Sequence, residues 1–372
     1  MGSDVAFSFG AVADVQCGDL DDRICPPLAN RYYRKAIECL EDTVAFWNSR
    51  SKKPSVVVQL GDVLDGFNAM KGGKEQSCQV LNSILNVCAS FEGDFHHAWG
   101  NHELYNFSRH ELLNGPLFSG KKHLERCHPQ AYKKSLSSSS VSHNQHLHRV
   151  DLQTNYSQSI KSNADCDLVL EETVPAYYDF SPHKGFRFVI LDTFEISIHG
   201  YGDSECALKD DALSILCAHN QNSDLYDHSG LEGLEKRFVE YNGGISNTQL
   251  DWLQGVLSKA SVKNEKVMLF GHVPICPEVT LEDCLVWNYQ EVLDILRASP
   301  CVVATLFGHT HEYAHHCDEV GIHHLVLPSI VECRPGSNAF ATFDVRDGGM
   351  VMHTEGEMPR KVDFNFRPSS AD

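Results

Sequence analysis

Five short polar strings in this sequence contain the kinds of side chain that bind metal ions in hydrolytic enzymes. Each string follows an apolar run rich in β-branched residues, so each is expected where a strand ends. Carboxylate, amide and imidazole groups together are what a two-metal hydrolytic centre uses. The strings are Asp-Val-Gln at 14–16, Gly-Asp-Val-Leu-Asp at 61–65, Gly-Asn-His-Glu at 100–103, Gly-His-Val-Pro at 271–274 and Gly-His-Thr-His at 308–311.

The first two strings supply carboxylates. Side chains two residues apart in an extended backbone face the same way, so Asp14 and Gln16 can reach one ion. Asp62 is expected to bridge two ions, because each of its oxygens can bind one. Asp65 is expected to orient a loop or a ligand instead. On its own, Asp14 would more often simply begin a turn.

The later strings supply neutral ligands. Asn101 offers a hard amide oxygen, and His272 projects from a turn that Pro274 makes rigid. His309 and His311 lie two residues apart and can serve two different ions. A lone pair of this kind is more often structural, but the four other strings favour metal binding.

Two further residues of the central string are expected to act without binding metal. His102 would point at the leaving oxygen or at the non-bridging oxygens of a phosphate. The predicted catalytic residues are therefore His102 and the bridging Asp62. Glu103 is expected to fix the loop. The nearby His96 and His97 are predicted to be packed strand residues.

The elements that must position these residues follow from hydrophobic runs and periodicity. In an open α/β sheet, ligands bind at the carboxyl ends of the strands. Helices are predicted over about 30–49, 74–90, 247–260 and 288–298. Strands are predicted over 5–13, 55–60, 94–99, 267–270 and 302–307, with a hairpin over 177–192, and strands near 323–327 and 339–345 are expected to complete a second sheet.

The pattern breaks in two segments, 104–174 and 199–245, which are predicted to be cap or loop insertions into a single domain spanning residues 1–372. The first contains a serine-rich stretch at 135–140, followed by three histidines predicted to be polar surface: His143, His146 and His148.

Substrate contacts are predicted from two loops. Arg31, Tyr32 and Arg34 follow the first polar string, where guanidinium groups suit phosphate oxygens and aromatic rings suit a base or ribose. A solvated first helical turn is the equally weighted alternative. Cys284 lies in the loop after His272 and could line the substrate pocket.

Length, charge and cysteine content exclude some classes of function and partner. The chain has 372 residues, 42% hydrophobic residues and a formal net charge of −19, which argues against a general nucleic-acid surface. No segment resembles a signal peptide or a membrane span. Fourteen cysteines scattered through such a chain are expected to be mostly reduced and buried. A cytoplasmic, monomeric protein without nucleic-acid or membrane partners is therefore predicted.

These five strings, in this order, resemble the calcineurin-like metallophosphoesterase family. The resemblance covers residues 5–311 and implies a four-layer αββα sandwich of two mixed β-sheets flanked by helices. It also implies a ligand partition, with a bridging hydroxide that attacks phosphorus in line. One ion would take Asp14, Gln16, Asp62 and His311, and the other Asp62, Asn101, His272 and His309.

One departure from the family pattern narrows the prediction. The first string of the family is usually Asp-x-His, whereas Gln16 offers an amide oxygen here, which favours Mn²⁺ or Mg²⁺ over Zn²⁺. Zn²⁺ or Fe could still occupy the sites on purification. The chain resembles the manganese-dependent ADP-ribose/CDP-alcohol diphosphatases in three features. These are the Asp-x-Gln form of the first string, the Arg-Tyr-Tyr-Arg stretch at 31–34 and the chain length.

That branch implies small-molecule nucleoside diphosphate substrates. ADP-ribose would give AMP and ribose 5-phosphate, and CDP-choline or CDP-glycerol would give CMP and a phosphoalcohol. The sequence does not select among these substrates. A cyclic-nucleotide phosphodiesterase would use the same ions and is the enzyme alternative. A non-catalytic scaffold is disfavoured because all seven ligand positions carry coordinating groups.

Overall fold

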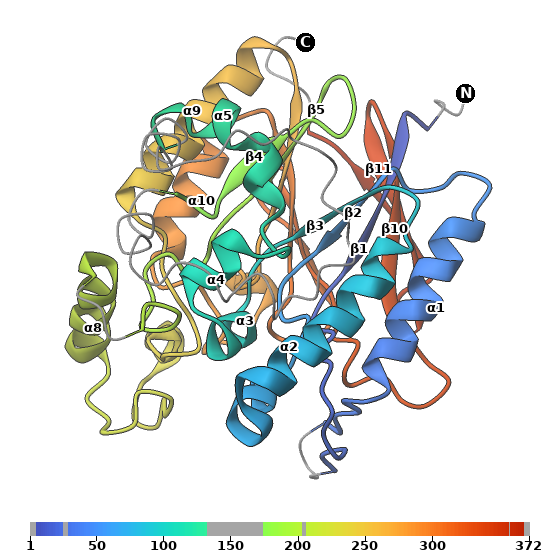
Figure 1. The fold of residues 1–372 in the computed structure, drawn as a ribbon. Coiled ribbons are helices and arrows are strands. Elements are labelled where there is room, and N and C mark those ends of the chain that lie inside the picture. Colours follow the sequence, from blue (N-terminus) through green and yellow to red (C-terminus); the bar gives the residue numbers. More distant parts are fainter. Residues whose placement is uncertain (1–4, 25–28, 132–173, 203–205, 357, 368–372) are drawn as a thin grey trace, which may run out of the picture.

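The computed structural model describes residues 5–24, 29–131, 174–202, 206–356 and 358–367. Two six-stranded β-sheets pack face to face, and helices cover their outer faces (Figure 1). The predicted αββα sandwich is therefore confirmed. The serine-rich stretch and the three histidines that were predicted to be polar surface, His143, His146 and His148, lie outside the described residues.

The first sheet has the strand order β12-β11-β10-β1-β2-β3. β1, β2 and β3 run parallel, whereas β10, β11 and β12 are added antiparallel. The strands are β1 (Phe7–Val12), β2 (Val56–Gln59), β3 (Asp94–His97), β10 (Ala339–Arg346), β11 (Gly349–Gly356) and β12 (Lys361–Asn365).

The second sheet has the order β4-β5-β6-β7-β9-β8, with antiparallel strands at both edges of a parallel centre. The predicted hairpin is its β4–β5 pair. The strands are β4 (Tyr178–Phe180), β5 (Phe186–Ile190), β6 (Lys266–Phe270), β7 (Val302–Phe307), β8 (Ala314–Cys317) and β9 (His323–Val326).

The helices α1 and α2 cover the first sheet, and α9 and α10 cover the second (Figure 1). Short helices follow β3, and α8 lies apart at the end of the molecule where the strands deliver their loops. The helices are α1 (Ala36–Ser49), α2 (Phe67–Ala89), α3 (Asn101–Asn106), α4 (Arg109–Asn114), α5 (Leu124–Cys127), α8 (Ala207–His219), α9 (Asn247–Val262) and α10 (Tyr289–Arg297), with short 3₁₀ turns at Ser119–His123, Gly233–Arg237 and Pro277–Val279.

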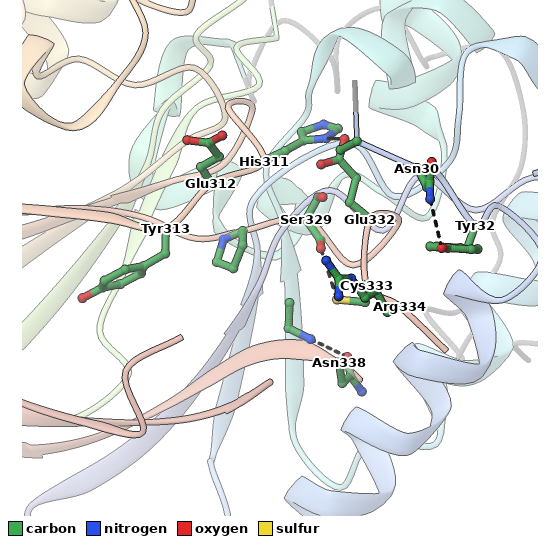
Figure 2. Close-up of a pocket in the computed structure, with 13 residues that line it drawn as sticks. Asn30, Tyr32, His311, Glu312, Tyr313, Ser329, Glu332, Cys333, Arg334 and Asn338 are labelled. Carbon is green, nitrogen blue, oxygen red and sulfur yellow. Dashed lines mark hydrogen bonds and ion pairs between the residues drawn. The ribbon is translucent and has the colours of Figure 1, made fainter. Parts of the chain in front are cut away.

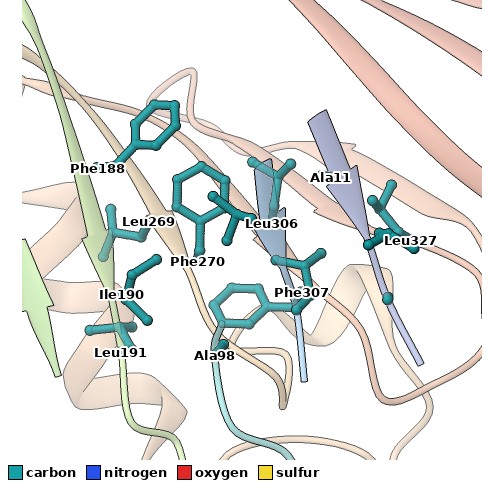
Figure 3. Packing of buried hydrophobic residues seen from close by; sticks show 14 of the residues in the cluster. Ala11, Ala98, Phe188, Ile190, Leu191, Leu269, Phe270, Leu306, Phe307 and Leu327 are labelled. Atoms are coloured by element: carbon teal, nitrogen blue, oxygen red, sulfur yellow. The ribbon is translucent and has the colours of Figure 1, made fainter. Parts of the chain in front are cut away.

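Aromatic rings fill the space between the two sheets (Figure 3). Phe9 of β1 stacks on Phe343 of β10 at 4.6 Å and meets Phe188 of β5 edge-on at 5.0 Å. Phe188 in turn lies 4.7 Å from Phe270 of β6. Burying a ring of this size contributes roughly 1.5–3 kcal/mol. This core therefore fixes the relative position of the two sheets.

The helix α9 has the predicted start and the predicted buried face. The Ser246 hydroxyl accepts the Gln249 backbone N–H at 3.2 Å, which caps the first turn. Leu250, Leu253 and Leu257 are all buried against the second sheet. The spacing that predicted this helix is thus the spacing of its packing contacts.

Three predictions about elements were wrong in detail. The first helix begins at Ala36 and not near residue 30, because Arg31 is held extended by backbone hydrogen bonds with Arg23. The second begins at Phe67 and is interrupted at Gly73, which has φ 65° and ψ −166°. The strand over 339–346 belongs to the first sheet, where it pairs with β1, and not to the second.

The twelve cysteines that the structure describes are free thiols, and seven of these are buried. Within the same ranges, no helix has both the length and the apolar character that crossing a bilayer requires.

Candidate metal centre

The loops after four central strands and the start of α3 bring all seven predicted ligand residues together. The backbone at most of these positions is strained. Six non-glycine residues of the described chain have positive φ, and five of them are predicted ligands: Asp14, Gln16, Asp62, His309 and His311. Conformations of this kind cost energy and cluster at functional sites. The fold therefore maintains unfavourable backbone geometry where the side chains must converge.

Two motif glycines are required by close packing against carboxylates. A Cβ on Gly100 would clash with Asp62 Oδ1, and a Cβ on Gly308 would clash with Asp14 Oδ2. The missing side chains leave space for the carboxylates beside the other ligands. These two glycines are therefore part of the site's shape.

One group of ligand atoms surrounds His272. Its Nε2 lies 3.2 Å from Asn101 Oδ1, 3.1 Å from His309 Nδ1 and 3.3 Å from Asp62 Oδ2. All four side chains point to one small volume. This is the group assigned above to the second ion.

A second group lies on the other side of Asp62. His311 Nε2 is 3.5 Å from Asp14 Oδ1 and 3.0 Å from Gln16 Nε2, and Gln16 Nε2 is 3.3 Å from Asp62 Oδ2. The Gln16 oxygen faces away and accepts a hydrogen bond from Arg31 Nη1 at 3.0 Å. Gln16 must therefore turn its amide over to offer oxygen to an ion.

Each histidine is fixed by a contact of its other ring nitrogen. His272 Nδ1 is 2.7 Å from the Leu60 carbonyl oxygen, and His309 Nε2 is 2.9 Å from Asn242 Oδ1. His311 Nδ1 is 2.6 Å from Glu332 Oε1. These acceptors favour a proton on the outer nitrogen, so the inner nitrogen presents a lone pair, as in metal-binding histidines.

The electrostatics of this cluster fit divalent cations. Asp14 Oδ1 accepts no hydrogen bond from the described part of the chain, and burial raises the pKa of its carboxyl group. Burial alone would lower the pKa of His272, but Asp62 and Asp14 raise it to about 9. The two buried carboxylates thus require a positive partner, which divalent ions would supply.

Glu103 ties two of the motif loops together. Its carboxylate accepts backbone N–H groups of Gly100 at 2.6 Å, Asp62 at 2.8 Å and Val63 at 2.6 Å. Burial and the nearby Asp62 raise the pKa of Glu103 to about 7. Its position between the loops explains how the strings at 61–65 and 100–103 are held in register.

His102 lies at the edge of the cluster with its Nδ1 occupied. The Gly66 N–H donates to His102 Nδ1 at 2.7 Å, and Asp65 Oδ2 is 3.5 Å from the same nitrogen. The His102 backbone N–H donates to Asp62 Oδ1 at 2.9 Å. In the neutral ring the proton is therefore on Nε2, which lies 3.8 Å from Asp62 Oδ2.

A cavity of about 490 Å³ opens beside the ligand cluster. Its walls combine guanidinium groups with aromatic and apolar side chains. Two of the tyrosines come from the insertion at 199–245. The lining residues are Gln16, Arg23, Arg31, Asp62, Asp65, Gly66, Phe67, Met70, Asn101, His102, Tyr105, Tyr226, Tyr241, Cys284, His309 and His311.

The predicted substrate contacts divide between this cavity and its surroundings. Arg31 and Cys284 line the cavity. Arg34 does not, because it pairs with Asp19 at 2.7 Å and Asp21 at 2.9 Å on the surface. Tyr32 also lies elsewhere, in a separate groove of about 620 Å³ that His311 lines as well (Figure 2). The extended backbone near Arg31 separates these neighbouring side chains.

Sequence reasoning missed Glu332, Asn242 and the two cavity tyrosines, Tyr226 and Tyr241. Tyr241 donates to Asp283 Oδ2 at 2.8 Å, and its ring lies 4.7 Å from that of Tyr226. None of these residues stands at the end of a predicted strand. Their only sequence signal is that they are polar or aromatic residues in loops.

Comparison with known proteins gives four consistent matches. A family model described as calcineurin-like phosphoesterase matches residues 7–313. A Xenopus laevis protein named manganese-dependent ADP-ribose/CDP-alcohol diphosphatase is 37% identical over 353 residues, covering 94% of this chain and 88% of that protein. A Homo sapiens protein of the same name is 32% identical over 374 residues, covering 99% and 95%. The crystal structure of a dimetal phosphatase from Danio rerio superposes with a TM-score of 0.79 at 32% identity, covering 98% of this chain and all of that one.

Proposed function

Because the chain belongs to the calcineurin-like phosphoesterase family, we propose that it is a manganese-dependent hydrolase of nucleoside diphosphate derivatives. Its substrates would be ADP-ribose, cleaved to AMP and ribose 5-phosphate, and CDP-alcohols, cleaved to CMP and a phosphoalcohol. The single observation that carries this proposal is the convergence of two ligand groups on Asp62 beside a cavity with basic and aromatic walls.

The ligand groups would hold one ion between Asp14, Gln16, Asp62 and His311, and the other between Asp62 and three neutral ligands: Asn101, His272 and His309. When bound, a pair of divalent ions activates a water molecule and neutralises charge on the phosphoryl group. The donor set contains four oxygen-bearing side chains and no thiolate, which suits Mn²⁺.

Gln16 and Arg31 couple ion binding to the cavity. Turning the Gln16 amide toward an ion breaks its hydrogen bond with Arg31 Nη1. The guanidinium group lines the cavity and also pairs with Glu332 through Nε at 3.4 Å, so this change makes its Nη1 available to phosphate oxygens. Arg31 is therefore proposed to bind the diphosphate only after the first ion is in place.

His102 is proposed to stabilise negative charge through Nε2–H. Its Nδ1 already accepts the Gly66 N–H, so the neutral ring can donate from Nε2 toward an oxygen of the reacting phosphate. The leaving group of an anhydride is itself a phosphate, which is a good leaving group without full protonation. A hydrogen bond at this position is consequently sufficient.

The aromatic side of the cavity is proposed to hold the base. Tyr226 and Tyr241 line the cavity with their ring centroids 4.7 Å apart, and Phe67 and Met70 add apolar surface. Stacking of a base on such rings contributes about 1–3 kcal/mol in other proteins and tolerates different bases. This tolerance is consistent with acceptance of both ADP and CDP derivatives.

The experiment is a parallel assay of ADP-ribose, CDP-choline, cyclic AMP and a phosphomonoester with Mn²⁺, Mg²⁺ or Zn²⁺. We expect Mn²⁺-dependent release of AMP and CMP from the first two substrates. Hydrolysis of cyclic AMP or the phosphomonoester alone would overturn the substrate assignment and favour a phosphodiesterase or phosphatase. Absence of hydrolysis with every metal would contradict the enzyme assignment itself.

A further inference from the structure

Three side chains of metal-binding type share one face of the β8–β9 pair, away from the centre described above. His315 and Cys317 are two residues apart on β8, so they point to the same side. Cys317 is directly opposite His323 of β9 in the antiparallel register. β8 is the edge strand of the second sheet, and both of its residues in this trio are exposed.

The two imidazoles are already spaced like ligands of one ion. His315 Nε2 lies 3.1 Å from His323 Nδ1. Two nitrogens bound tetrahedrally at the usual zinc–nitrogen distance are about 3.3 Å apart. The two nitrogens would therefore need to move very little to bind the same ion.

His323 is oriented as metal-binding histidines are. Its Nε2 lies 2.8 Å from the Asn365 carbonyl oxygen of β12, which accepts the ring proton. Nδ1 then turns its lone pair toward His315. A backbone carbonyl in this role fixes both the tautomer and the direction of the ring.

Cys317 can reach the same point. Directly opposed residues of an antiparallel pair have Cβ atoms about 4.5–5.5 Å apart. The thiol now lies 3.9 Å from the Asp318 carbonyl oxygen, a weak contact that rotation about χ1 would break. In this conformer the thiol does not lie within ligand distance of both imidazole nitrogens, so coordination requires it to rotate toward them.

We propose that His315, Cys317 and His323 form a zinc site that is separate from the catalytic centre. Two imidazoles and a thiolate are a typical zinc donor set, and the exposed edge leaves a fourth position for water. Binding displaces the thiol proton and places the remaining ring proton of His315 on Nδ1.

One aromatic ring of the other sheet covers part of this group. The ring centroid of Phe364 lies 4.9 Å from that of His315 and 5.2 Å from that of His323, so this ring shields one side of the site. An ion here would bind β8 to β9 close to β12 of the other sheet.

The test is a Co²⁺ titration of the reduced, full-length protein. Co²⁺ bound to a thiolate gives a charge-transfer band in the near ultraviolet, and the seven proposed ligands of the catalytic centre include no cysteine. We expect this band to appear, to be removed by Zn²⁺, and to be lost in Cys317→Ser and in His315→Gln. A Cys217→Ser variant is the matched control, since Cys217 is also an exposed free thiol, and should retain the band.

A second measurement makes the result independent of folding defects. Mn²⁺-dependent turnover should be unchanged in both variants, while each should bind one Zn²⁺ fewer than the wild type in competition with a chromophoric chelator. Absence of the band in the wild type, its persistence in Cys317→Ser, or equal zinc stoichiometry in all four proteins would overturn the proposal.

Discussion

At the scale of single residues, Asp62 has the largest predicted effect on activity. Its Oδ2 faces both ligand groups, so replacing the carboxylate with an amide should weaken both ion sites. We expect Asp62→Asn to lower kcat/KM by about 10³-fold or more. Asp251→Asn, an exposed residue of α9, is the matched control and should behave as wild type. Near-normal turnover of Asp62→Asn would contradict the two-ion arrangement.

Glu332 is expected to act on the reaction through His311. Its carboxylate holds His311 Nδ1 at 2.6 Å, which directs Nε2 inward. We expect Glu332→Gln to reduce Mn²⁺ affinity or kcat/KM by about 10- to 100-fold. The control is Glu312→Gln. Glu312 follows His311 in the sequence, but its exposed carboxylate does not contact His311 in the described structure, so this substitution should leave Mn²⁺ affinity and kcat/KM unchanged. Equal effects of the two substitutions would point to a general charge effect.

The Gln16 amide is predicted to set metal preference. An imidazole at this position adds a nitrogen ligand and should shift the preferred ion from Mn²⁺ toward Zn²⁺. We expect Gln16→His to retain its fold, measured by circular dichroism, while the ratio of Zn²⁺- to Mn²⁺-supported activity rises. An unchanged ratio would remove Gln16 from the ligand set.

At the scale of elements, β3 makes the fold sensitive to acid. Burial lowers the pKa of His96 to about 3 and that of His97 to about 4, whereas the value for an unperturbed histidine is 6.5. The unfolded chain therefore takes up protons first as pH falls below 6.5. The stability is fully present above this pH and is lost as pH falls toward 4, by up to about 1.4 kcal/mol per pH unit for each histidine.

Urea unfolding at several pH values, with a chelator present, measures this loss. His96→Gln should make the free energy of unfolding less dependent on pH by roughly one proton. His228→Gln, an exposed histidine, should keep the wild-type dependence. Identical slopes in all three proteins would show that the β3 histidines do not control acid stability.

Elements also show which features sequence could predict. The strands that deliver Asp14, Asp62, His272 and His309 were predictable because a polar string after an apolar run is a local signal. The pairing of β10 with β1 was not, since their sequences lie more than 300 residues apart and a strand does not encode its neighbour. The helix start was misplaced because backbone hydrogen bonds of Arg31 with Arg23, and of Tyr32 with the distant Val331, override local helix propensity.

The residues supporting the site were harder to predict than the ligands. Glu332 and Asn242 reach His311 and His309 from loops with no periodicity. Such contacts depend on how distant segments pack, and spacing within one segment does not reveal them. Arg34 was predicted to bind substrate and does not line the cavity. Its position near Arg31 in the sequence suggested a substrate contact for both residues, which the extended backbone at Arg31 prevents.

At the scale of the whole molecule, the proposed metal centre joins the two sheets. Asp14, Asp62 and Asn101 follow strands of the first sheet, whereas His272 and His309 follow strands of the second. Ions bound only by the folded chain should stabilise it by about 2.7 kcal/mol at 100 times the dissociation constant. We expect Mn²⁺ to raise Tm by several degrees relative to the chelator-treated protein. Asp62→Asn should show little of this shift in calorimetry, and an equal shift would place the stabilising ion elsewhere.

The central position of β1 has a consequence for synthesis on the ribosome. β10, one of the two neighbours of β1, pairs Val345 with Phe7 and is synthesised more than 300 residues after β1. Until then β1 has an open edge able to pair with another chain. The nascent protein must therefore keep an apolar strand protected while the intervening residues are translated, and a chain that ends before residue 339 would lack the strand that covers it. Loss of the β10–β11 hairpin is thus expected to increase aggregation of the nascent chain.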